Sequence, residues 1–126
     1  MITLSNTLFG TIFVILVDSV YLKLNKKMYE PILDPSVGIN YVSAVISWLI
    51  IVLTIQLIVL SRKDLTESYA ITYGAFLGFG MYGVYNATNY ATFQNKWNIN
   101  MAIVDTAWGT FLTSLTTYFL YKINNK

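Results

Sequence analysis

Four polar side chains suited to proton or cation chemistry lie inside apolar stretches of this 126-residue chain. Asp18 lies in one stretch, Asn86 and Asn89 lie in another, and Asp105 lies in a third. Carboxylates in apolar surroundings are costly, and within membranes they nearly always face a cavity or another polar group. Two carboxylates close together cannot both ionise cheaply, so such a pair could hold a proton, a cation or an amine.

Four apolar segments must position these residues, and each is near the ~20 residues that a helix needs to cross a bilayer. The chain is 56 % hydrophobic and only 11 % charged, whereas soluble domains carry about 25 % charged residues. We therefore predict an all-α membrane protein, a bundle of four transmembrane helices that forms a single domain over residues 1–126. The predicted spans are residues 4–22, 39–60, 69–90 and 99–121.

The predicted protein is integral and multi-pass, and the lipid bilayer is its first partner. The first segment carries Asp18 and lacks a basic leader and a small-residue cleavage site, so we expect a retained span. Basic residues divide evenly between the two sides, which leaves the orientation undetermined. Because they are scattered, we expect no nucleic-acid partner. A homo-oligomer or a membrane-protein partner remains open.

Helical spacing places a second polar or aromatic side chain beside each of these residues, because positions three apart lie on one face. If the chain crosses the membrane four times, the helix ends that carry the two acids and the two amides lie on the same side. These residues then lie within roughly 10 Å of one membrane face. The sequence thus predicts one polar cluster, with the two acids and two amides pointing at one another. Its members are Asp18, Tyr21, Tyr85, Asn86, Asn89, Asp105 and Trp108.

The third segment also contains the glycine-rich stretch "GAFLGFGMYG", in which Gly74 and Gly78 form a G-x-x-x-G pattern. Such glycines let two helix backbones approach closely. We assign Gly74, Gly78 and Gly83 to helix packing within the monomer, with a dimer face as the alternative. Trp97 is expected to be an interfacial anchor, and residues 28–38, "MYEPILDPSVG", an irregular loop.

Several motifs together resemble domain-of-unknown-function family 2177, a group of small predicted four-span membrane proteins. They are "DSVYL" at residues 18–22, "GAFLGFGMYGVYNATNYAT" at residues 74–92, Trp97, and "VDTAWG" at residues 104–109. Tyr29 is similar to a family tyrosine in the first loop. The resemblance implies the architecture and the motif set. The family usually has an acid at the position of Asn86 and often a tryptophan at that of Tyr21.

Three functions remain open at this point. The first is a pocket that binds or passes a cation, a proton or a small polar solute. The second is a structural scaffold or assembly subunit, in which the polar cluster joins helices. The third is a membrane-embedded lipid-modifying enzyme, in which paired acids and tyrosine do acid–base work or hold a divalent metal. With no cysteine and no histidine, the sequence favours a non-enzyme and predicts no cofactor and no metal site.

Overall fold

The computed structural model describes residues 2–125, which form five α-helices and no β-strand. The α-helices are α1 (Leu4–Leu24), α2 (Lys26–Tyr29), α3 (Tyr41–Thr54), α4 (Glu67–Thr92) and α5 (Ile99–Asn124). A 3-10 turn, η1 (Glu30–Ile32), follows α2, and a π-helical segment, η2 (Ile55–Leu60), continues α3. The prediction of an all-α fold is confirmed.

Each long helix begins directly after a threonine or an asparagine, which are residues that cap helix N-termini well. The side-chain oxygen of each capping residue accepts the backbone N–H of the residue three positions later. The capping residues are Thr3, Asn40, Thr66 and Asn98. The cap at Asn40 explains why the second long helix begins at Tyr41 rather than at residue 39.

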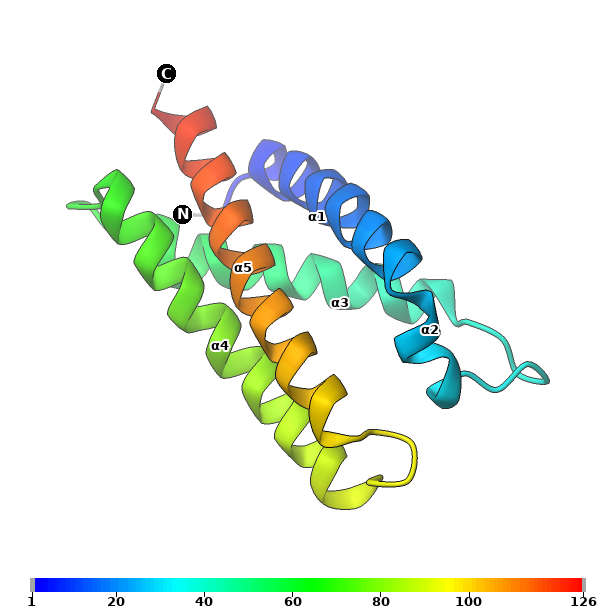
Figure 1. Ribbon diagram of the computed structural model, residues 1–126. Helices are drawn as coiled ribbons and strands as arrows, with labels where there is room; N and C mark the ends of the chain where they lie inside the picture. The colour runs from blue at the N-terminus through cyan, green and yellow to red at the C-terminus, as the bar shows by residue number, and fades with distance from the viewer. Residues whose placement is uncertain (1, 126) are drawn as a thin grey trace.

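The long helices α4 and α5 lie side by side as an antiparallel hairpin, and α1 packs against α5 and α3 (Figure 1). The helix α3 lies behind them in this view and packs against α1, while its continuation η2 contacts α4 and α5. The start of α1 and the end of α5 lie at one end of the molecule, and α2 and the α4–α5 connection lie towards the other. The arrangement thus gathers both connections near one end of the helices.

Glycines bring the backbones of α4 and α5 into direct contact. A Cβ atom on Gly78 would lie 2.6 Å from the carbonyl oxygen of Gly109, and one on Gly74 would lie 2.6 Å from Thr117 Oγ1. A Cβ atom on Gly83 would make only an ordinary contact, 3.8 Å from Thr106. The two helices therefore meet within one chain at positions where any side chain would collide.

The connection between α1 and α3 differs from the irregular loop expected for residues 28–38. Its first part is helical, because α2 ends at Tyr29 and η1 follows directly. Met28, Tyr29 and Ile32 pack against Trp97 and its neighbours. Burial of these side chains explains the local order, which the two prolines in the sequence did not suggest.

Polar residues are concentrated inside this fold, and large apolar residues cover much of its outside. The buried polar residues are Asn6, Asp18, Gln56, Asn86, Asp105, Thr113, Thr116 and Thr117. By contrast, Leu4 is 84 % exposed, and Phe76 and Val84 are each 70 % exposed. By length and composition, two helical segments of the described chain could span a membrane, Leu4–Leu24 and Tyr41–Leu60, with mean hydropathies of 1.7 and 2.5.

Candidate functional site

Asp18, on α1, accepts hydrogen bonds from two tryptophans that come from two other helices. Trp48 Nε1, from α3, lies 2.8 Å from one carboxylate oxygen, and Trp108 Nε1, from α5, lies 2.7 Å from the other. The carboxylate is buried, with a residue exposure of 9 %. An indole N–H can only donate, so this carboxylate holds three helices together as an acceptor.

Asp105, on α5, lies in a second and separate set of hydrogen bonds. The Tyr29 hydroxyl donates to one of its oxygens at 2.6 Å, and Asn86 Nδ2 donates to the other at 2.7 Å. Trp97 Nε1 in turn donates to Asn86 Oδ1 at 2.8 Å. Because Asn86 is almost fully buried, this chain of donors fixes both the asparagine amide and the carboxylate beyond it.

Two tyrosines connect these two groups. The Tyr21 and Tyr29 hydroxyls lie 3.0 Å apart, and the Tyr21 ring stacks on Trp108 with 4.0 Å between ring centroids. Burial and the neighbouring Asp105 raise the pKa of Tyr29 well above its ordinary value. Tyr29 therefore keeps its proton and acts as a donor to Asp105. The result is one continuous assembly from Asp18 through Trp108, Tyr21 and Tyr29 to Asp105.

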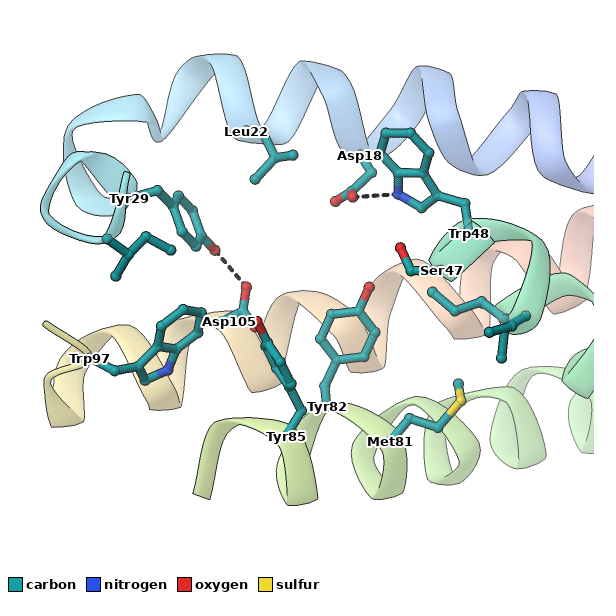
Figure 2. Close-up of a pocket in the computed structure, with 13 residues that line it drawn as sticks. Asp18, Leu22, Tyr29, Ser47, Trp48, Met81, Tyr82, Tyr85, Trp97 and Asp105 are labelled. Atoms are coloured by element: carbon teal, nitrogen blue, oxygen red, sulfur yellow. Dashed lines mark hydrogen bonds between the residues drawn. The ribbon is translucent and has the colours of Figure 1, made fainter. Parts of the chain in front are cut away.

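Both carboxylates line one cavity of about 470 Å³ (Figure 2). Aromatic side chains from four parts of the chain form much of its wall, namely Tyr29, Trp48, Tyr82, Tyr85 and Trp97. Figure 2 shows Tyr82 rising from α4 with its hydroxyl directed towards the α1 side of the cavity. The Tyr82 ring packs directly against the backbone of Gly109. The remaining lining residues are mainly aliphatic and include Leu22, Ile50, Ile51 and Met81.

The carboxylates receive hydrogen bonds only from neutral groups. Their four donors are two indoles, a phenol and an amide. Within residues 2–125, the ion pairs join Arg62 to Asp64 and Lys122 to Glu67, and none reaches Asp18 or Asp105. No group of three or more acidic side chains in that part of the chain is placed to hold a metal ion. The site therefore offers two carboxyl groups without a basic side chain beside them.

The structure brings together most of the residues that the sequence nominated. Asp18 joins Trp108, Asn86 joins Asp105, and Tyr21 stacks on Trp108. Tyr85 lines the cavity and packs edge-on against Trp97, with 5.5 Å between ring centroids. The two acids and two amides do not all point at one another, because Asp18 and Asp105 have separate donors.

Asn89 requires a correction. Its side chain makes no hydrogen bond within the described residues and does not line the cavity. The face of α4 that meets α5 repeats every four residues, through Ala70, Gly74, Gly78 and Asn86. Since Asn89 is three positions after Asn86, it lies to one side of that face.

The role expected for Trp97 was also wrong. Rather than anchoring at an interface, its side chain is buried, with 7 % exposure, and it donates to Asn86. Trp48 and Tyr82 were not among the site residues nominated from the sequence, although both line the cavity. For Trp48 a signal existed, because a buried indole N–H needs an acceptor and Asp18 is one of few available.

Comparisons with known proteins agree with the sequence motifs. Residues 3–121 match the family described as "Predicted membrane protein (DUF2177)". No significant match was found among curated proteins or solved structures. The match includes all five helices up to the last turn of α5. The resemblance seen in the sequence is thereby confirmed, and the chain belongs to domain-of-unknown-function family 2177, a family of predicted membrane proteins.

Proposed function

We propose that this chain is a four-span membrane protein whose cavity binds a positively charged solute. The observation that carries the proposal is the pair of buried carboxylates on one cavity wall, with only neutral donors beside them. Buried charges are normally paired with an opposite charge or a metal. A solute cation would provide that charge for Asp18 and Asp105.

The case for four spans depends on where the polar residues of α4 and α5 lie. Each of these helices has 26 residues, or about 39 Å at 1.5 Å per residue, which exceeds a ~30 Å hydrocarbon core. Their polar residues lower the mean hydropathy, yet Asn86, Asp105 and Thr113 are buried. Their outer faces carry exposed Phe79 and Ile103 instead. A hydropathy average counts the buried polar residues and so understates how apolar the outer surface is.

A structural role is the second candidate, and one observation favours it. Both oxygens of each carboxylate already accept a hydrogen bond from the protein. Interhelical polar contacts in membranes average only about 0.6 kcal/mol, however. A carboxylate costs about 2.5–3.5 kcal/mol at a helix centre on insertion scales, and less towards the membrane face near which Asp18 and Asp105 are predicted to lie. Helices could be joined at lower cost by amides and hydroxyls, so we place cation binding first.

Ligand-dependent stability separates these two candidates. The protein is reconstituted in lipid nanodiscs, and its thermal unfolding is followed with Na⁺, K⁺, Mg²⁺ and ammonium salts at equal ionic strength and at two pH values. Cation binding predicts that at least one of these salts raises the unfolding temperature, because a ligand at a hundredfold excess over Kd adds about 2.7 kcal/mol to the free energy of unfolding. The increase is lost in Asp18→Asn and in Asp105→Asn.

The matched control is Asp64→Asn, because Asp64 is an exposed carboxylate outside the site. This variant keeps the full cation response if the response comes from the cavity. An equal response in all variants would show general salt stabilisation, and the structural role would then move to first place. Absence of any response to cations or protons would have the same consequence.

A further inference from the structure

The residues that line the cavity indicate which kind of cation it binds, beyond the fact that two of them are acids. Bare metal ions prefer several oxygen ligands converging at 2.0–2.6 Å, and the described residues hold no such group of acids. A proton needs no cavity, whereas this one measures about 470 Å³, within the ~300–1,000 Å³ range of small-molecule sites. Both alternatives therefore fit this wall less well than an organic ion does.

The aromatic part of the wall suits a cation whose charge is spread over carbon. Five aromatic residues line the cavity, namely Tyr29, Trp48, Tyr82, Tyr85 and Trp97. Aromatic faces attract ammonium groups through their electron-rich centres, and groups of such rings recognise alkylated ammonium ions. Because the carboxylate oxygens already accept hydrogen bonds, they favour a cation that needs only electrostatic attraction.

The opening of the cavity indicates an apolar body on the same ligand. Lining residues of α3 and α4 remain exposed, with Ile50 at 53 % and Tyr85 at 54 %. The main contacts of α3 are with α1, while only its continuation η2 packs substantially on α4. The mouth therefore lies between α3 and α4, on the side of the bundle that would face lipid. Ile51 and Met81 give the interior an apolar wall, and Leu22, which is 38 % exposed, extends this wall outward on α1.

We infer that the cavity binds an alkylated ammonium ion with an apolar body, admitted between α3 and α4. This inference rests on the proposed function, because it names the class of cation. The ammonium group lies among the aromatic rings between Asp18 and Asp105, and the apolar part extends towards Ile50 and Met81. Such an ion could come from water as a small quaternary amine or from the bilayer as an amphiphile, and the ammonium chemistry is the same.

Intrinsic fluorescence gives a direct assay, because the chain has three tryptophans. Trp48, Trp97 and Trp108 all belong to the hydrogen-bonded assembly around the cavity. The protein in nanodiscs is titrated with choline, with hexyltrimethylammonium, with NaCl, and with dimethylbutanol, the uncharged carbon isostere of choline. We expect a saturable change with both ammonium ions and none with dimethylbutanol. Tighter binding of hexyltrimethylammonium supports the apolar body and a ligand from the bilayer, whereas equal affinity would overturn the apolar body and leave a small quaternary amine from water.

A matched pair of tyrosines on α4 tests the aromatic wall without removing a hydrogen bond to either carboxylate. Tyr85 is 54 % exposed at the mouth, and Tyr69 is 50 % exposed elsewhere on the same helix. Neither hydroxyl forms a hydrogen bond within the described residues. We expect Tyr85→Leu to weaken ammonium binding about fivefold and Tyr69→Leu to leave it unchanged.

The outcomes separate this inference from the function on which it rests. Binding of Na⁺ or protons without binding of either ammonium ion would overturn the inference and leave cation binding intact. Binding of dimethylbutanol as tightly as choline would overturn both, as would the absence of any cation response. Equal losses in Tyr85→Leu and Tyr69→Leu would overturn the aromatic wall as the basis of selectivity.

Discussion

Asp18 and Asp105 differ in what their donors can do when the carboxylate is replaced. Trp48 and Trp108 can only donate, so Asp18 must supply two acceptors. Asp105 faces Tyr29, whose hydroxyl can donate or accept and also lies within hydrogen-bond distance of Tyr21. The two sites therefore respond differently to the same change of carboxylate into amide.

We expect Asp18→Asn to lower the free energy of unfolding by about 1–3 kcal/mol, because one buried indole N–H would face an amide NH₂ group. Asp105→Asn should cost under ~1 kcal/mol. Its new amide can accept from Asn86 and donate to Tyr29, which then donates to Tyr21. Thermal unfolding in detergent measures both, with Asp64→Asn as the control. Equal losses, or a larger loss at Asp105, would contradict this account.

From the sequence we nominated the acids, the amides and Trp108, but not the donors Tyr29, Trp48 and Trp97. Asp18, Asn86 and Asp105 stand out because polar residues are rare in apolar segments. Tyr29 and Trp97 lie in the connections between helices, where sequence periodicity gives no information on direction. Their contacts with Asp105 and Asn86 depend on how the two connections fold over one end of the helices.

The helices α4 and α5 pack in close contact through glycines. Gly78 lies against the backbone of Gly109, and a carbonyl oxygen there cannot move aside as the end of a flexible side chain can. Gly80, two residues later on the same helix, has no atom within 4 Å of the position that a Cβ atom would take. The two glycines thus form a matched pair on one helix.

We expect Gly78→Ala to destabilise the protein by about 1–3 kcal/mol, since an overpacked contact forces the helices apart. Gly80→Ala should be neutral, or stabilising by up to ~1 kcal/mol, because alanine favours helix more than glycine does. Thermal unfolding of both variants in the same detergent makes the comparison. A Gly78→Ala protein as stable as the wild type would show that the contact between α4 and α5 is looser than described.

The glycine pattern showed that a close helix contact exists but not which face of α4 forms it. Spacings of three and four both fit a helix, and the three-residue choice placed Asn89 beside Asn86. The contact with α5 follows the four-residue spacing through Gly74, Gly78 and Asn86. Only the position of the partner helix could decide between them.

The whole molecule has an exterior that is more apolar than its composition suggests. Hydropathy by composition selects α1 and the segment Tyr41–Leu60 as candidate spans. The polar residues of α4 and α5 are directed inward, where Asn86, Asp105 and Thr113 are buried. If all four long helices cross the membrane, the α4–α5 connection lies on the same side as the α1–α3 connection. If only the first two cross, it lies on the opposite side.

Because the chain has no cysteine, single-cysteine variants can locate its connections. We expect Ser36→Cys and Asn95→Cys to react with an impermeant maleimide from the same side, and Lys63→Cys from the other. All three residues are exposed. With only two spans, Asn95→Cys would react from the same side as Lys63→Cys. The unmodified chain is the control for background labelling.

The hydrogen bonds that join the site also set an order on its assembly. Those at Asn86 link residues 11 and 19 positions apart, so the α4–α5 hairpin can form them alone. Asp18 and Trp108 are 90 positions apart, and Tyr29 and Asp105 are 76 apart. During synthesis, Asp18 can accept from Trp48, which is 30 positions away, but its other oxygen has no indole donor until Trp108 on the last helix has been made. Any chain that stops before Trp108 therefore leaves one oxygen of Asp18 without its indole donor.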